Sequence, residues 1–175
     1  DSADPRRVAA ARSAQAQHDP GRCILVAWSR EVIDRINAEL SKQIKQRRRG
    51  PAIRASFDKW SAAVLVPDED VAAEVANRLA AEHVNLAVAD PDAWLARVRH
   101  GGEVFLGDAT PVAAGDYWAG PSHCLPTGTP ARFSSGISVY TFLKRTGTVA
   151  YRTGMSEATI DAIARLAEAE GLDGH

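Results

Sequence analysis

Histidines that lie near carboxylate or amide side chains are the first candidates for chemistry in this sequence. The chain contains five histidines, and four of them have such a neighbour. These groupings are Gln15 with His18, Glu82 with His83, Asp116 with His123, and Glu170 with His175. Imidazole nitrogens combined with carboxylate and amide oxygens, without a thiolate, suit zinc or a similar divalent ion that keeps open positions for a substrate. The pattern therefore indicates one shared metal site.

Each histidine also has an ordinary structural interpretation. A single surface histidine is usually solvated, and a Gln-x-x-His pair such as Gln15 and His18 often arises by chance. His100 precedes Gly101-Gly102 at a predicted helix end, where a partly charged imidazole suits the helix dipole, so we assign it a structural role. Spacing alone leaves the metal site and the structural interpretation both open.

A long segment rich in glycine, proline and small hydroxyl residues carries one of the four groupings. Residues 114–136 read AGDYWAGPSHCLPTGTPARFSSG and show almost no hydrophobic periodicity, so we predict a loop there. Loops of this kind often carry binding or catalytic side chains on a rigid scaffold. We expect this loop to bring Asp116 and His123 to the edge of a sheet.

Alternating strands and helices must position these side chains. Short apolar runs predict strands at residues 23–28, 62–66, 84–89 and 103–106. Capping and periodicity predict helices at residues 6–17, from the Ser29 cap to a stop at Gly50, after Pro51, from the Asp68 cap through Ala81, after Asp90-Pro91, and at about 157–170 with a stop at Gly171.

This alternation predicts an α/β fold. We expect a Rossmann-like, doubly wound, mostly parallel sheet with helices on both faces, plus a small C-terminal helical appendage. Residues 1–137 would form the α/β domain that carries the metal and catalytic residues, and residues 138–175 would form the appendage. Ligands in such folds gather beyond the carboxyl ends of strands.

Composition narrows the class of protein. A net charge of −1 argues against binding to nucleic acid or to an anionic membrane, and the basic residues Lys45 and Arg47–Arg49 read as the carboxyl end of a helix. Two cysteines, Cys23 and Cys124, cannot form a disulfide framework, and we see no secretory signal and no apolar run long enough to span a bilayer. We therefore expect a cytoplasmic protein. Because the chain opens on Asp1, we also expect it to be a piece of something longer.

Several stretches, in order, resemble the histidinol dehydrogenase family, specifically its carboxy-terminal half. They are SAQAQHDP (13–20), AAEH (80–83), EVFLGD (103–108), the loop 114–136, VYTFLKRT (139–146) and AEAEGLDGH (167–175). The resemblance covers essentially the whole chain, and the loop is its most specific part.

The resemblance implies roles for eight residues. Those that look like zinc ligands, and so also contact the substrate, are Gln15, His18, Asp116 and His175. Glu82 and His83 look like the catalytic acid/base pair, and His123 and Glu170 look like substrate contacts. The family oxidises L-histidinol to L-histidine with NAD, in the last two steps of histidine biosynthesis. It does so as a homodimer, and the resemblance implies that the appendage is an exchanged arm that supplies Glu170 and His175 to the partner.

The sequence also departs from the family pattern. Relatives commonly have proline at Ala81, leucine at Val84, valine at Cys124 and glycine at Thr129. We interpret Cys124 as a small buried apolar substitute, whereas Thr129 changes the backbone freedom of the loop and so bears on substrate fit. The part of the family that holds most of the NAD site is absent, and no G-x-G-x-x-G follows a strand. Two alternatives therefore stay open: a related zinc- and NAD-dependent dehydrogenase for another alcohol, and a noncatalytic zinc-binding or dimerisation module.

Overall fold

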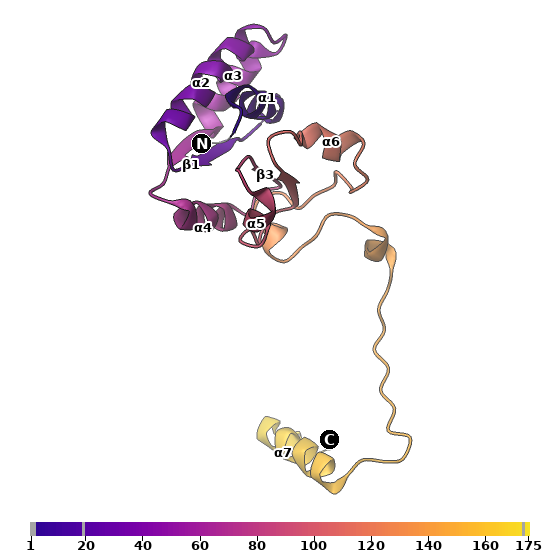
Figure 1. Cartoon of the computed structure of the whole chain (residues 1–175). Helices are drawn as coiled ribbons and strands as arrows, with labels where there is room; N and C mark the ends of the chain where they lie inside the picture. The colour runs from indigo at the N-terminus through magenta and orange to yellow at the C-terminus, as the bar shows by residue number, and fades with distance from the viewer. Residues whose placement is uncertain (1–2, 19, 173) are drawn as a thin grey trace. The chain divides into compact units, whose positions relative to one another are not determined.

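The chain forms two compact units. The computed structural model describes residues 3–18, 20–172 and 174–175. Its first unit is Asp1–Thr141 and its second is Phe142–His175 (Figure 1). The predicted boundary after residue 137 lies a few residues before the division between these units.

Parallel strand pairs form the centre of the first unit. Strand β1 (Ile24–Ala27) pairs with β2 (Ala62–Leu65), and β3 (His83–Leu86) pairs with β4 (Glu103–Leu106). Both pairs are parallel, as expected where each crossover contains a helix, so the predicted α/β class is confirmed. Within the described residues the two pairs are separate ladders. One continuous, doubly wound sheet therefore stays a prediction.

The helices of the first unit begin at the predicted caps. They are α1 (Pro5–Gln15), α2 (Arg30–Lys45), α3 (Gly50–Trp60), α4 (Glu69–Leu79) and α5 (Pro91–Leu95). The side chains of Asp4, Ser29, Asp68 and Asp90 each accept a hydrogen bond from a backbone N–H of the first turn that follows. Such bonds satisfy donors that the helix itself leaves unpaired, which explains why these starts are readable in the sequence.

Two helix ends differ from the prediction. Helix α1 ends at Gln15, so His18 lies in the turn beyond the helix. Helix α4 ends at Leu79 because Ala80 adopts a left-handed conformation with a φ of 45°. A non-glycine residue in this region is uncommon, and no glycine marks the end of this helix in the sequence.

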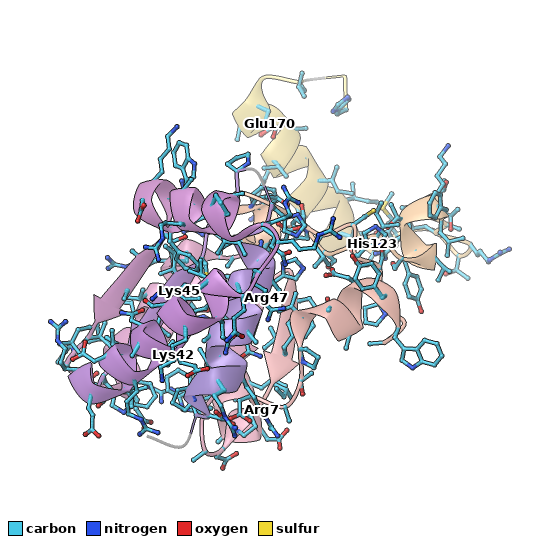
Figure 2. All side chains as sticks on the ribbon, turned by 90° about the horizontal axis from the view of Figure 1, so that it is seen from above. Arg7, Lys42, Lys45, Arg47, His123 and Glu170 are labelled. Carbon is cyan, nitrogen blue, oxygen red and sulfur yellow. The ribbon has the colours of Figure 1, made fainter. Side chains whose placement is uncertain are left out.

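Gly50 does not stop α2, as the sequence analysis predicted, but begins α3. An added Cβ at this position would lie 2.6 Å from the backbone oxygen of Ile44, so the glycine permits close packing of two consecutive helices. Lys42, Lys45 and Arg47 lie at the carboxyl end of α2, where positive charge favours the helix dipole (Figure 2).

Two apolar clusters hold the first unit together. Helices α1, α2 and α3 lie around β1 (Figure 1), and the cluster among these helices contains the fully buried Ala9, Ala16 and Ile53. The second cluster is centred on α4, α5 and β3 and includes partly buried residues of both strand pairs, among them Val26 and Val104. Both pairs therefore share one core.

The predicted loop 114–136 contains more regular structure than expected. Its first residues belong to helix α6 (Val112–Tyr117), and a short 3-10 turn, η1 (Pro130–Arg132), lies near its end; a second, η2 (Val139–Phe142), follows the loop. Asp116 therefore lies on a helix, whereas His123 lies in irregular chain. No side chain caps α6, so its start has no local signal of the kind seen at α2 or α4.

The second unit contains the predicted C-terminal helix. Helix α7 (Glu157–Glu170) begins after Ser156, whose side chain accepts from the Thr159 N–H. It ends at Gly171, which has a φ of 72°, as the sequence predicted. Across the part of the chain that the structure describes, the helices are too short or too polar to cross a membrane.

The two cysteines differ in exposure, which corrects the prediction that Cys124 is buried. Cys124 is exposed, whereas Cys23 is partly buried. Burial raises the pKa of the Cys23 thiol, and the nearby Arg12 guanidinium opposes this rise through its charge and a hydrogen bond.

We expect a neutral thiol-modifying reagent to label Cys124 quickly and Cys23 slowly at neutral pH, because the thiolate is the reactive form. The pKa of the Cys23 thiol is higher in the folded than in the unfolded protein. The neutral thiol therefore contributes its whole share of the folding stability at a pH below the unfolded-state pKa, and this share is lost as the pH rises through the folded-state pKa. Mass spectrometry of a labelling time course measures both rates. A Cys124→Ser variant that still incorporates label quickly would contradict this expectation.

Candidate functional site

His83 is the first residue of β3, rather than part of the link before it as predicted. It pairs in register with Glu103, the first residue of β4. Paired residues of parallel strands project from the same face of a sheet, so the imidazole and this carboxylate lie on one face at the amino ends of two strands. This location corrects the expectation of a site beyond the carboxyl ends.

Asp116 reaches His83 from α6. Its Oδ1 atom lies 3.7 Å from His83 Nε2, a distance that fits an ion pair only when the imidazole is protonated. The preceding residue, Gly115, is buried against β4. A Cβ added there would lie 2.6 Å from Glu103 Oε2 and 2.8 Å from the Phe105 ring. The missing side chain of Gly115 therefore allows α6 to come close enough for Asp116 to meet His83.

Three polar atoms of this cluster are buried without partners in the described chain, whereas the side chain of Asp116 is 30% exposed. Within the described residues, both ring nitrogens of His83 and the Oε2 atom of Glu103 are buried without a hydrogen-bond partner. The His83 ring also lies against Phe105, with 5.9 Å between ring centroids. Buried polar groups are normally paired, so unpaired ones at one location mark a site that binds or reacts.

Glu103 is a member of this cluster that sequence reasoning missed. The sequence pattern places it only in the strand predicted at residues 103–106. The available signal was a carboxylate at the head of an otherwise apolar run, EVFL. Its burial depends on α6, which follows later in the sequence, so local pattern could not reveal it.

Glu82 lies in the short link before β3 and is half-buried. Its backbone oxygen accepts a hydrogen bond of 2.9 Å from the Glu103 N–H, which extends the β3–β4 ladder by one step. Glu82 and His83 therefore enter the strand pair together, with consecutive side chains directed to opposite faces of the extended chain.

Gln15 and His18 lie just before β1, as Glu82 lies just before β3. Gln15 is the half-buried last residue of α1, and His18 is exposed in the turn that follows. Gly21 packs against this turn, since an added Cβ would lie 2.7 Å from the backbone oxygens of both residues. No hydrogen bond or ion pair within the described residues joins Gln15 or His18 to Asp116.

The rest of the loop exposes His123 and strains one residue. His123 and its neighbour Cys124 are both exposed (Figure 2 labels His123). Thr129 has a φ of 87°, which is a genuine outlier for a β-branched residue. Arg132 ties the loop to the end of α4, because its guanidinium donates to the backbone oxygen of Arg78.

Glu170 and His175 lie in the second unit. Glu170 is the last residue of α7, and the His175 N–H donates to the Leu172 oxygen at 3.1 Å. Both residues are exposed. The two units are described separately, so whether these residues join the cluster around His83 stays a prediction.

The predicted donor set suits zinc by its chemistry. An amide oxygen, two imidazoles and a carboxylate provide the nitrogen and oxygen ligands that zinc accepts while keeping room for a substrate. Over residues 3–18, 20–172 and 174–175, no three histidine, cysteine, aspartate or glutamate side chains are grouped to hold a metal ion. The four-ligand set from Gln15, His18, Asp116 and His175 therefore stays a prediction.

The first unit is thus an α/β unit in which the imidazole of His83 lies beside the carboxylate of Asp116 and in register with Glu103. Comparison with known proteins makes the class specific. The family model described as histidinol dehydrogenase matches residues 1–175, and the chain belongs to this family.

Individual relatives agree with this assignment. The chain is 44% identical over 175 residues to a histidinol dehydrogenase of Nitratidesulfovibrio vulgaris and 45% identical over 176 residues to one of Zymomonas mobilis. These matches cover 99% and 98% of this chain, respectively, but 40% of each relative. A crystal structure of histidinol dehydrogenase from Elizabethkingia anophelis matches 99% of this chain and 40% of its own, with a TM-score of 0.87 and 28% identity. The chain thus spans about 40% of the length of these relatives.

Replacing Gly115 with alanine tests the close packing of α6. We expect Gly115→Ala to lower the free energy of unfolding by about 1–3 kcal/mol, because the new methyl group has no room beside Phe105 and Glu103. Denaturant titration measures this change. The matched control is Ala113→Ser on an exposed position of the same helix, for which we expect a change within about 0.5 kcal/mol. Equal stabilities of Gly115→Ala and the original protein would contradict the packing argument.

Replacing Thr129 with glycine tests the strain in the loop. A left-handed conformation costs an L-residue roughly 1–2 kcal/mol, whereas the extra freedom of glycine costs about 0.5–1 kcal/mol. We therefore expect Thr129→Gly to raise the free energy of unfolding by up to about 1 kcal/mol. Thr127→Gly is the control: Thr127 has no positive φ, so this change should lower stability by about 0.5–1 kcal/mol. A loss of stability in Thr129→Gly similar to that of the control would argue against strain.

Proposed function

We propose that this chain is the metal-binding and proton-transferring part of a histidinol dehydrogenase. The protein would oxidise L-histidinol through L-histidinal to L-histidine with two NAD, in the last two steps of histidine biosynthesis. Family membership over all 175 residues supports the substrate. The observation that carries the mechanism is the buried imidazole of His83 beside the carboxylate of Asp116.

The residues proposed to hold zinc are Gln15, His18, Asp116 and His175. When bound, zinc would supply a Lewis acid that ligates the amine and imidazole of histidinol and so fixes the position of its alcohol carbon. His123 and Glu170 would contact the substrate from the loop and from the end of α7. NAD supplies the hydride acceptor, and its site would lie mainly outside this chain.

His83 takes the hydroxyl proton of histidinol in the first oxidation. A neutral imidazole has one nitrogen free to accept a proton near neutral pH, and burial keeps water from competing for that nitrogen. The side chain of His83 is 13% exposed and both of its ring nitrogens are buried, so the protein holds the ring on most sides. The C–H bond of the alcohol carbon gives its hydride to NAD as this proton leaves, which produces the aldehyde.

Glu82 acts in the second oxidation. Its carboxylate accepts a proton from water, and that water attacks the aldehyde carbon to form a hydrate. The hydrate would then give a hydride to a second NAD and release its two hydroxyl protons to the proton acceptors of the site and to solvent, which leaves the carboxylate of histidine. The backbone supports this pairing of roles only in part: the β3–β4 ladder holds the main chain at both residues, while their side chains leave it in opposite directions.

The protein is proposed to act as a homodimer in which the second unit is an exchanged arm. Glu170 and His175 would then complete the site of the partner subunit. The short C-terminal segment supports joint delivery of these two residues, since its backbone bonds connect α7 to His175 through Leu172.

The decisive experiment offers L-histidinol and NAD to the zinc-loaded protein that contains this chain. We expect histidine and two NADH for each histidinol consumed. His83→Asn should reduce turnover about 10²–10⁴-fold while zinc content stays unchanged, since a proton acceptor is lost but no ligand. Asp116→Asn should mainly reduce zinc content, because it removes a charged ligand.

Turnover and metal analysis by mass spectrometry separate these roles, with His100→Asn as a control outside the site. Oxidation of another alcohol but not of histidinol would point to a related dehydrogenase, and no NADH from any alcohol would point to a noncatalytic module. Loss of zinc from His83→Asn, with normal turnover once zinc is resupplied, would reverse the assigned roles.

A further inference from the structure

The carboxylate of Glu103, a half-buried residue, has no part in the proposed mechanism. Its Oε2 atom is buried and has no hydrogen-bond partner within the described residues. Burying a carboxylate oxygen without a partner is unfavourable, so an unpaired one calls for a functional explanation. The position of Glu103 beside His83 indicates the role of its carboxylate.

The strand register places Glu103 beside His83. The two residues are partners in the β3–β4 ladder, and neighbouring strands lie about 4.8 Å apart. Two further contacts mark the same face: the His83 ring lies against Phe105, and Gly115 approaches both Phe105 and Glu103 Oε2. The carboxylate and the imidazole therefore share one enclosure between β4 and α6.

The unpaired atoms of the two side chains are complementary. A neutral imidazole carries one N–H donor and one acceptor nitrogen, and an ionised carboxylate only accepts. Asp116 lies near Nε2 of His83 and is assigned to the metal in the proposed function, so it is not free to orient the ring. Glu103 is the remaining carboxylate in the enclosure, and the Nδ1 atom of His83 is the remaining nitrogen.

We propose that Glu103 is a positioning residue for His83. Its carboxylate accepts the imidazole N–H when the two side chains turn toward each other across the ladder. This bond selects one tautomer of the ring and fixes its plane, so that the other nitrogen faces the substrate proton. The inference rests on the proposed function only in taking His83 as the proton acceptor.

Two substitutions separate positioning from simple packing. Glu103→Gln keeps the shape and one acceptor oxygen, whereas Glu103→Met keeps a similar length but removes the acceptor. At a pH where the ring is neutral, ¹⁵N NMR of labelled histidine should show one dominant tautomer of His83 in the original protein and in Glu103→Gln. Glu103→Met should show a mixture of both tautomers.

Steady-state kinetics of the zinc-loaded protein provide the second measurement. We expect Glu103→Met to lower kcat about 10–100-fold, the size of effect that follows loss of a residue orienting a metal-ligating histidine, with little change in KM and in zinc content. Glu103→Gln should recover most of the lost kcat. The control is Val104→Ala, which changes the opposite face of β4 in the apolar core and should lower stability without altering the tautomer or kcat.

A single dominant His83 tautomer and a normal kcat in Glu103→Met would overturn the proposal. So would a Glu103→Gln variant that behaves like Glu103→Met in both measurements. If the original protein does not oxidise histidinol, the proposed function fails, but the tautomer comparison still decides whether Glu103 positions His83.

Discussion

The close approach of α6 to β4 is the constraint on which the cluster around His83 depends. Gly115 is the contact point, because a Cβ atom added there would collide with Glu103 Oε2 and the Phe105 ring. Because Asp116 is the next residue, its carboxylate is brought to the ring of His83 by the backbone and not by a long flexible side chain. A short aspartate can hold one position at small entropic cost, which suits a group that must meet a second residue accurately.

Strands β3 and β4 determine which side chains lie beneath α6. Register pairs His83 with Glu103, and the alternation along β4 puts Phe105 on the same face as Glu103. The other face carries Val84 and Val104 into the apolar core that α4 and α5 cover. The β3–β4 pair thus has one face in the apolar core and an opposite face that carries His83 and Glu103 beside α6. In the enclosure between β4 and α6, removal of water strengthens the interaction of a buried charge with its neighbours.

Local signals predicted much of this fold, and distant contacts account for the rest. The caps at Ser29, Asp68 and Asp90 and the stop at Gly171 act within one helical turn, so the sequence alone revealed them. Helix α6 has no side-chain cap and contains a glycine, so it depends on packing against β4 and was predicted as loop. Gly50 was read as a helix stop because the pattern cannot distinguish a glycine needed for a left-handed turn from one needed for close packing. Cys124 was expected to be buried because it replaces the valine common in relatives, yet it is exposed.

The candidate site divides in the same way between local and distant causes. Glu82 and His83 are consecutive, so one strand start fixes both of them. Glu170 and His175 are likewise connected by a local cause: the Leu172 N–H donates to Ala167, and the His175 N–H donates to Leu172. The local sequence therefore determines how the two residues of each pair lie relative to one another. No local pattern determines how these pairs come together, because that depends on packing between elements far apart in the chain. The packing of Gly115, which brings Asp116 to His83, is an example. A metal ion held by the proposed ligands Gln15, His18 and Asp116 would supply such a distant contact within the first unit, since its bonds would join the end of α1 to α6.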